Sequence, residues 1–289
     1  MKGINMEETI LYRLKTEMSK LTPSQQKVAS YILKNSMEVS FFTVEHLASQ
    51  TRVSVATVMR LAYSLGYSGY VEFQKELQDF VLNETSPPSR LAVNIKKMSN
   101  NKILVQCAEK QIQNIQKTIM DISDEQAEEA IELILKAKKV YVIGLRTSSP
   151  TACYLEEGLN RIGVNSELLI PESSRLQSLL AKISEDSLLI SIALPRYAKK
   201  TIEITQIAYN QGAKILAITD SDRSPLAKMS NVFLSCSYES LAFHNSALAA
   251  TFIADYLVTA TALKEPEKSK EELERIEKIV TLMKANLYK

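Results

Sequence analysis

Arginine and hydroxyl side chains gather in a short segment that could bind an anion. The segment Gly144-Leu145-Arg146-Thr147-Ser148-Ser149-Pro150 follows an apolar run and precedes a helical pattern. Hydroxyls and unpaired backbone N–H groups at a helix start attract anions, and proline suits an early helical position because it has no N–H to leave unpaired. The segment therefore predicts an anion site that uses Arg146, Ser148 and Ser149.

A second segment, Ser191-Ile192-Ala193-Leu194-Pro195-Arg196-Tyr197-Ala198-Lys199-Lys200, has a similar setting and ends in cations. If both segments follow neighbouring strands of one sheet, the guanidinium groups of Arg146 and Arg196 can converge on one phosphate or carboxylate. Ser191 would add a hydroxyl, and Tyr197 would donate a hydrogen bond or stack. Alternatively, Arg146 pairs with an acidic side chain, Glu156 or Asp220, and the site is filled and structural, because such ion pairs are common.

The chain offers few groups for catalysis or metal binding. Its histidines are His46 and His244. His46, in the first helix of the candidate pair described below, is expected to contact solvent or phosphate, and His244 lacks a placed carboxylate for proton transfer. The cysteines, Cys107, Cys153 and Cys236, form no CxxC pair, which argues against a disulfide framework or a zinc site and favours a reducing cytoplasm. We therefore expect no catalytic residue, no metal and no cofactor.

Residues 44–65 have the pattern of a helix-turn-helix. The small Ala48 allows two helices to cross closely, and the Ser54 hydroxyl can accept a hydrogen bond from an unpaired N–H at the start of the second helix. The turn has Arg52 where glycine is usual, and a left-handed conformation there costs about 1 to 2 kcal/mol. Either the turn avoids that conformation or packing offsets the strain.

This pattern is typical of DNA binding, in which the second helix enters the major groove. The chain has no Asp or Glu between Glu45 and Glu72, so this surface would not repel phosphates, and an arginine can bind guanine or phosphate in bidentate fashion. The alternative is a helical protein-interaction domain. The candidate DNA contacts are Arg52, Ser54, Val55, Ala56, Thr57 and Arg60.

Composition requires the DNA-binding charge to be local. The chain has 289 residues and a formal net charge of +2, so it has no global field of one sign. Apolar residues make up 45% and charged residues 24%, as in globular proteins. We expect dimerisation to double a weakly charged DNA-binding module. The dimer would form through the second domain of the chain and the helix at residues 245–263, with residues 268–289 buttressing it.

Apolar periodicity predicts an all-helical domain followed by an α/β domain. Short apolar runs alternate with amphipathic stretches, which is typical of a five-stranded parallel sheet in three layers, covered on both faces by helices. The runs are residues 140–143, 167–170, 187–192, 214–218 and 232–234. The helical stretches are residues 151–161, 174–183, 199–211 and 225–229.

The predicted boundaries follow composition. Residues 1–82 form the helical domain, and residues 83–101 form a linker because Pro87 and Pro88 prevent the preceding helix from continuing. The α/β domain covers residues 102–264, including its leading helix. Residues 265–289 form a terminal helix whose apolar stripe needs a partner.

The helical domain resembles the N-terminal region of RpiR-family bacterial transcriptional regulators, which pair a helix-turn-helix with a sugar isomerase (SIS) domain. The run Ala217-Ile218-Thr219-Asp220, with Ser224-Pro225-Leu226-Ala227 after it, resembles the fourth strand and following turn of the SIS fold. The segments that carry the first resemblance are Leu21-Thr22-Pro23-Ser24-Gln25-Gln26-Lys27-Val28-Ala29, Val53-Ser54-Val55-Ala56-Thr57-Val58-Met59-Arg60 and Leu65-Gly66-Tyr67-Ser68-Gly69-Tyr70.

The resemblance implies phosphorylated sugars as ligands, but the loops depart from the family pattern. The usual first loop reads G-x-G-x-S and the usual second loop reads S-x-S-G-x-T. Here Arg146 replaces the second glycine of the first loop, Ala193 removes a hydroxyl donor, and Leu194 places a side chain where the second loop usually has glycine. We interpret these changes as adaptation to an altered anionic effector.

The sequence thus predicts a cytoplasmic transcriptional regulator and not an enzyme. Its expected partners are double-stranded operator DNA, a small anionic metabolite such as a sugar phosphate or sugar acid, and further copies of the chain in a homodimer or dimer of dimers. No membrane partner is expected. The alternatives are a SIS-type sugar-phosphate isomerase with an accessory helical domain and a protein-binding scaffold.

Overall fold

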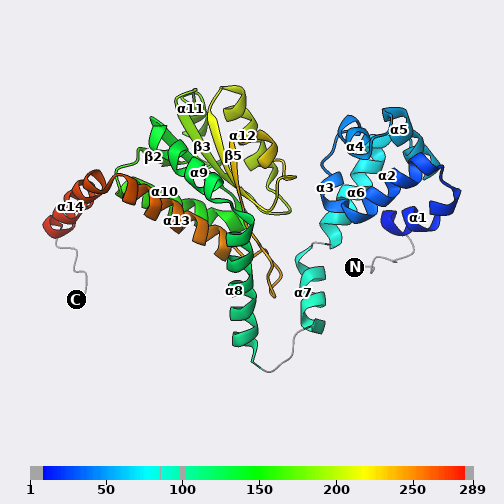
Figure 1. Cartoon of the computed structure of the whole chain (residues 1–289), viewed down its shortest axis with the longest axis horizontal. Coiled ribbons are helices and arrows are strands. Elements are labelled where there is room, and N and C mark those ends of the chain that lie inside the picture. The colour runs from blue at the N-terminus through cyan, green and yellow to red at the C-terminus, as the bar shows by residue number, and fades with distance from the viewer. Residues whose placement is uncertain (1–8, 85, 98–101, 284–289) are drawn as a thin grey trace. The chain divides into compact units, whose positions relative to one another are not determined.

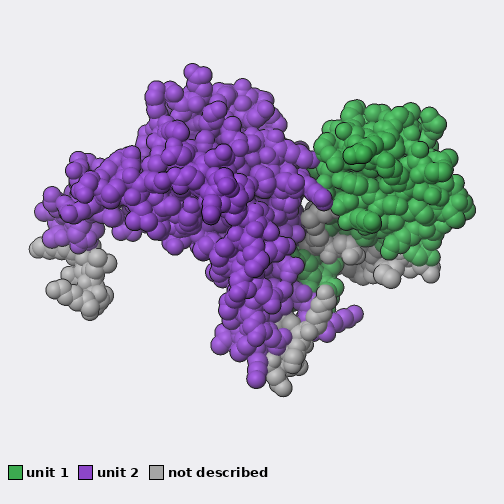
Figure 2. All heavy atoms as spheres, viewed as in Figure 1, with its two compact units in different colours: residues 1–93 green, residues 94–289 purple. Residues whose placement is uncertain are grey.

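The computed structural model describes residues 9–84, 86–97 and 102–283. The chain divides into two compact units, Met1–Val93 and Asn94–Lys289, which are coloured separately in Figure 2. Across the described ranges, no helix combines the length and apolar character needed to cross a bilayer.

The first unit is entirely helical within its described residues, as predicted. Its apolar faces meet in one core that includes Leu14, Ile32, Leu47, Leu61 and Phe73. Thr22 caps α2 with a capping box, and Pro23 occupies the first helical position. The helices, blue to cyan in Figure 1, are α1 (Ile10–Thr16), the short 3₁₀ helix η2 (Met18–Lys20), α2 (Pro23–Lys34), α3 (Ser36–Val39), α4 (Val44–Thr51), α5 (Val55–Ser64) and α6 (Tyr70–Glu84).

The second unit contains the predicted five-stranded parallel sheet, with the strand order β2-β1-β3-β4-β5. Its strands are β1 (Lys139–Gly144), β2 (Ser166–Leu168), β3 (Ser187–Ile192), β4 (Lys214–Thr219) and β5 (Val232–Ser235). Its helices are α8 (Ile103–Asp121), α9 (Asp124–Lys136), η3 (Arg146–Ser148), α10 (Ser149–Arg161), α11 (Leu176–Leu180), α12 (Lys199–Asn210), η4 (Ala227–Met229), α13 (Leu248–Lys264) and α14 (Pro266–Leu282).

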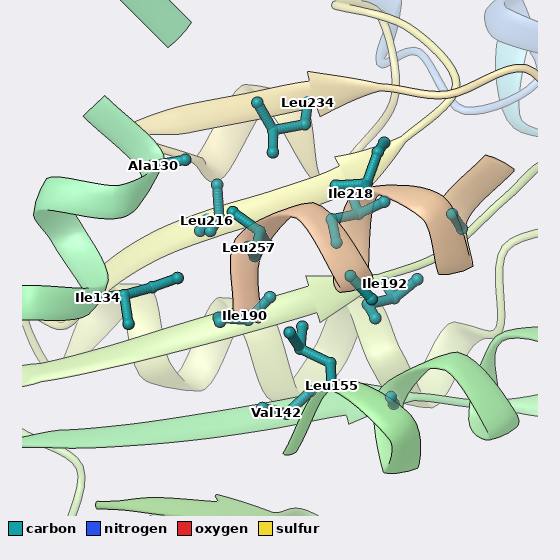
Figure 3. Close-up of a cluster of buried hydrophobic side chains, with 14 of the residues drawn as sticks. Ala130, Ile134, Val142, Leu155, Ile190, Ile192, Leu216, Ile218, Leu234 and Leu257 are labelled. Carbon is teal, nitrogen blue, oxygen red and sulfur yellow. The ribbon is translucent and has the colours of Figure 1, made fainter. Parts of the chain in front are cut away.

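The strands are buried on both faces because alternate residues enter different cores. On one face, Val142 and Ile190 pack with Ile134 of α9, Leu155 of α10 and Leu257 of α13 (Figure 3). On the opposite face, the alternating residues Tyr141, Ile143, Leu189 and Ile215 pack with side chains of α11 and α12. The three-layer α/β fold expected from the apolar runs is confirmed.

The sheet order places two loops side by side. From β1 the chain passes to β2 on one side and then to β3 on the other, and the carboxyl ends of β1 and β3 are aligned, with Gly144 opposite Ile192. Open α/β sheets bind ligands at such a switch point, beyond the carboxyl ends of the strands. The loops that follow β1 and β3 are the two arginine-bearing segments.

Some elements differ from the sequence predictions. The predicted linker at residues 83–101 contains a helix, α7 (Pro87–Lys97), because Pro87 begins a helix instead of only ending one. Residues 225–229, expected as a helix, form the short η4 (Ala227–Met229). The last six residues of the expected terminal helix lie outside the described ranges, and the proposed domain boundaries stay predictions.

Candidate functional site

The first candidate site is the surface of α5 in the helical unit. Ser54 is its N-cap, accepting a hydrogen bond from Thr57 N at 3.2 Å, and the two hydroxyl oxygens lie 2.9 Å apart. Val58 and Leu61 face the core of the unit. The outward residues at the start of the helix are therefore presented on a rigid element, and the exposed candidates on and beside it are Arg52, Ser54, Val55, Ala56 and Arg60, with Thr57 partly exposed.

The turn before α5 adopts the strained alternative. Arg52 has φ 52° and ψ 50°, a left-handed conformation, as the C-cap of α4. Its N–H donates to Ser49 O at 3.0 Å, and Val53 N donates to Ala48 O at 3.0 Å. These bonds satisfy carbonyl groups that the helix end leaves open, and buried Thr51 holds the last turn through its hydroxyl. Backbone hydrogen bonds and packing thus offset the strain.

Within the described residues, the guanidinium groups of Arg52 and Arg60 are exposed and take part in no ion pair. His46, in α4, lies edge-on to Phe42, with ring centroids 4.2 Å apart. The surface around α5 therefore carries cationic side chains that are not neutralised by a neighbouring carboxylate, which is what a phosphate backbone requires.

The second candidate site, which we call the anion site, is formed by the loops after β1 and β3. Gly144 ends β1 where the chain turns sharply into η3: a Cβ there would lie 2.7 Å from Ser148 O and 3.0 Å from Ala152 Cβ. Only glycine fits this approach. The tight turn brings Ser149 to the start of α10, where it is exposed.

The two arginine-bearing loops of the anion site contact one another, and the convergence of both guanidinium groups on one anion stays a prediction. Arg146 has φ 58° and Arg196 has φ 68°, so both loops use arginine in a left-handed backbone conformation. Arg146 Nη1 donates to the backbone O of Arg196 at 3.5 Å, a long hydrogen bond. Arg146 is exposed and Arg196 is half-buried, and both lie in loops that follow the carboxyl ends of neighbouring strands.

The acidic residues considered as partners of Arg146 are engaged elsewhere. Glu156 Oε1 accepts a hydrogen bond from Ser166 Oγ at 3.2 Å. Asp220 Oδ1 accepts one from Tyr197 OH at 2.6 Å. Within the described residues, Arg146 forms no ion pair with either acid.

The predicted hydroxyl groups of the anion site differ in accessibility. Ser191 is fully buried, and its Oγ lies 2.5 Å from Thr205 Oγ1 in α12. Ser148 is 3% exposed. The exposed serine is Ser149. Ser148 and Ser191 thus have buried side chains, and their role as ligand contacts stays a prediction.

Sequence reasoning missed two contacts that position the second loop. Asp220, at the end of β4, holds the Tyr197 hydroxyl. Asn245, before α13, donates from Nδ2 to Pro195 O at 2.8 Å. These partners are distant in sequence, and no local pattern indicates them. Leu194, which stands where the second loop usually has glycine, is 4% exposed and packs in the core.

The possible catalytic groups are poorly placed for chemistry. His244 is exposed and lies edge-on to Phe243, with ring centroids 4.8 Å apart. Cys236 is buried at the end of β5, and burial together with the charge of Asp220 raises the pKa of its thiol well above the usual range. A thiol of raised pKa is a weak nucleophile at neutral pH.

Family models match both parts of the chain. Residues 8–84 match the helix-turn-helix domain of the rpiR family, and residues 133–260 match the SIS domain. A relative from Caldanaerobacter subterraneus subsp. tengcongensis, described as an uncharacterized HTH-type transcriptional regulator, is 25% identical over 96% of this chain and 99% of its own length. HexR, an HTH-type transcriptional regulator of Pseudomonas aeruginosa, is 23% identical over 78% of each chain.

Solved structures agree with this assignment. The NanR protein of Vibrio vulnificus, complexed with ManNAc-6P, is 26% identical and superposes with a TM-score of 0.69, covering 96% of this chain and 99% of NanR. The sugar isomerase domain of an RpiR transcription factor from Sphaerobacter thermophilus is 27% identical with a TM-score of 0.60, covering 62% of this chain and 99% of that domain. The chain therefore belongs to the RpiR family, with the family's helix-turn-helix at its N-terminal end and a SIS domain after it.

Proposed function

We propose that this protein is a cytoplasmic, sequence-specific DNA-binding transcriptional regulator whose SIS domain senses a small anionic metabolite. One observation carries the proposal: the same chain presents an exposed, cationic helix-turn-helix surface and a pair of arginines at the ligand edge of a SIS sheet. Two of its relatives are named as transcriptional regulators, and NanR has a sugar phosphate bound.

On the DNA side, α5 would lie in the major groove. Arg60 is the candidate for bidentate contact with guanine or phosphate, and Arg52 the candidate for a phosphate contact beside the groove. Val55, Ala56 and Thr57 would face the base edges, with Ser54 near a phosphate. The absence of acidic residues between Glu45 and Glu72 supports this surface over a protein-binding alternative.

On the effector side, we propose a phosphorylated sugar or a related sugar acid. Arg146 and Arg196 would bind the charged group, since guanidinium groups match the geometry of phosphate and carboxylate. Ser149 and Tyr197 would add hydrogen bonds, with Ser148 and Ser191 supporting the loops. Arg146 stands where the usual loop pattern has glycine. Glycine can contact a ligand only through its backbone, so the replacement supports a contact from a charged side chain.

A homodimer or dimer of dimers would match an operator with two-fold symmetry. The support is a groove of about 1010 Å³ in the α/β unit, lined mainly by apolar side chains of α13 and α14. Leu263 and Leu273, which line it, are 74% and 44% exposed, and Met283 at the end of α14 is 74% exposed. The apolar stripe of α14 thus lacks cover within the described residues of one chain, as expected for a surface that a second copy buries.

The regulatory mechanism would be linkage between the two sites. An effector that binds one arrangement of the protein better than another shifts the DNA affinity by that difference, typically about 1 to 3 kcal/mol. The exposed His244 and the buried Cys236 supply no paired acid and base, which supports a receptor over an isomerase.

Selection of bound fragments from a genomic DNA library by the purified protein tests the proposal, repeated with sugar phosphates and sugar acids. We expect enrichment of particular duplexes, steep salt dependence and a shift with an anionic sugar. Arg146→Ala and Arg196→Ala should weaken effector binding. Turnover of a sugar phosphate without DNA preference would instead favour an isomerase, and unchanged effector affinity in both variants would remove the arginine site.

A further inference from the structure

The loop between β5 and α13, residues 237–247, contacts the second loop of the anion site. Asn245 is 8% exposed and donates from Nδ2 to Pro195 O at 2.8 Å. This carbonyl belongs to the Pro195–Arg196 peptide, whose orientation is tied to the φ of Arg196, 68°. A flip of that peptide into an unstrained conformation would turn the carbonyl away from Asn245. The hydrogen bond is therefore expected only while Arg196 keeps its left-handed conformation.

The same loop contacts α7 on another side. Asn94 Nδ2 donates to Ser240 O at 3.1 Å and to Ala242 O at 2.9 Å. The apolar side chains of α7 are largely exposed, with Val93 at 48% and Ile95 at 63%. Because α7 buries little apolar surface, its position depends strongly on polar contacts such as these.

The base of the loop is anchored to α8. Asn114 is 2% exposed; its Nδ2 donates to Glu239 O at 2.7 Å, and its Oδ1 accepts from Ser237 Oγ at 3.0 Å. Ser246 N donates to Tyr238 O at 3.0 Å and closes the base. A loop closed and anchored at its base moves as a unit, so a displacement at Asn245 reaches the carbonyl groups that Asn94 binds.

We propose that this loop couples the anion site to α7. An anion bound by Arg196 changes the Pro195–Arg196 peptide, Asn245 follows its carbonyl, and the loop carries the change to Asn94. The inference rests on the proposed function, because α7 follows α6 of the helix-turn-helix unit along the chain and would pass effector occupancy towards it. Asn94 and Asn245 are positioning residues, since Asn94 binds backbone carbonyl groups of this loop and Asn245 binds a backbone carbonyl of the second loop of the anion site.

Amide hydrogen exchange of the full chain, without DNA or effector, tests the coupling. Asn245→Ala should speed exchange in α7 by roughly 5-fold or more, the lower end of typical coupling between sites. Reciprocally, Asn94→Ala should speed exchange in residues 196–198. Asn165→Ala is the matched control, because Asn165 Nδ2 also donates to a backbone carbonyl, Lys138 O at 3.2 Å, at the opposite edge of the sheet.

Equal exchange of α7 in Asn245→Ala and in the control would overturn the proposal. Acceleration of the β3 amides as large as that of α7 would also overturn it, since it indicates general destabilisation. If Asn245→Ala does not fold, Asn94→Ala decides, because Asn94 lies on a helix with little burial, and unchanged exchange at residues 196–198 refutes the route. None of these exchange measurements uses DNA or effector. A negative exchange result would therefore refute the coupling and leave the proposed function untouched. Conversely, if the protein did not bind DNA, the exchange result could still be interpreted.

Discussion

The turn of the helix-turn-helix and the loops of the anion site both place arginine in a backbone conformation that suits glycine. Arg52, Arg146 and Arg196 have φ values of 52°, 58° and 68°. A left-handed conformation costs an L-residue about 1 to 2 kcal/mol, and glycine avoids this cost. Strain of this kind persists only where the surroundings impose it, and it concentrates at functional sites.

The two regions differ in what the arginine side chain does. Arg52 is exposed and, within the described residues, makes no side-chain hydrogen bond or ion pair, so it contributes charge alone. Arg146 reaches the neighbouring loop and donates to Arg196 O. A flexible cation suits a phosphate backbone that it must follow, whereas a cation fixed across two loops suits one small anion. The comparison predicts that DNA binding depends on charge and effector binding depends on geometry.

The largest effect should come from reversing charge on the DNA side. Ala56 is exposed in the first turn of α5, where glutamate favours the helix. Ala56→Glu should therefore keep the fold but weaken DNA binding by about 2 kcal/mol or more, because like charges brought together across an interface cost several kcal/mol. Fluorescence anisotropy with a selected operator measures this loss.

Ala56→Gln is the control, since it adds a side chain of the same length without charge. If both variants lose affinity equally, shape and not charge governs the α5 surface, and the comparison is wrong on the DNA side.

Next in size is the loss of a fixed cation at the anion site. Arg146→Gly should weaken binding of an identified sugar phosphate by about 1.5 to 3 kcal/mol, the usual worth of a hydrogen bond to a charged group. It should also stabilise the α/β unit, because glycine removes the left-handed strain. Calorimetry measures both quantities on one sample.

The matched variant is Lys199→Ala, which removes an exposed cation at the start of α12. An equal loss of effector affinity in Lys199→Ala would show that net positive charge alone accounts for effector binding. The prediction that effector binding depends on geometry would then be wrong.

A smaller effect is expected from Arg52→Gly. The variant should stabilise the helical unit by about 1 kcal/mol through release of strain. It should also reduce the salt dependence of DNA binding by about one ion per recognition unit, as for loss of a phosphate contact. Arg52→Ala removes the same charge but keeps the strain, so it should share the weaker salt dependence without the added stability. Equal free energies of unfolding for Arg52→Gly and Arg52→Ala would show that release of strain does not stabilise the unit.

Local features of the sequence allowed much of both regions to be predicted. Apolar runs flanked by turns indicated the sheet, because parallel strands are buried on both faces. Ser54 indicated the start of α5, since a serine hydroxyl satisfies the first backbone N–H groups. The pairing of the Arg146 and Arg196 loops followed from the order of strands in such folds.

The remaining features depend on contacts between distant residues. The Asp220 carboxylate that holds Tyr197, and the Asn245 amide that holds Pro195 O, lie on other elements. The orientation of Ser191 toward Thr205 depends on which face of β3 meets α12. Because β3 is buried on both faces, its sequence does not reveal which face is which, so the Ser191 hydroxyl could not be assigned to the ligand or to the core.

The smallest predicted effect concerns two glutamates, one in each unit. The pKa of each carboxyl group is lowered, but by a different cause. In the helical unit, Ser68 N and Ser68 Oγ each donate to Glu72 at 2.7 Å and lower its pKa. In the α/β unit, the pKa of Glu132 is lowered by a hydrogen bond from Lys136 and by its charge. A pKa lowered on folding gives stability above the unfolded value that is lost as pH falls through the folded one.

Glu72→Gln and Glu132→Gln should therefore each destabilise their unit slightly at neutral pH, and the difference from the parent should vanish in acid. Salt distinguishes them. The donors to Glu72 belong to a neutral serine, so its contribution should persist at high ionic strength, whereas the exposed Glu132–Lys136 pair should be screened. Urea unfolding at two pH values and two salt concentrations measures this. Equal loss of both contributions in salt would show that the field of surrounding charges, and not the Ser68 donors, holds Glu72 ionised.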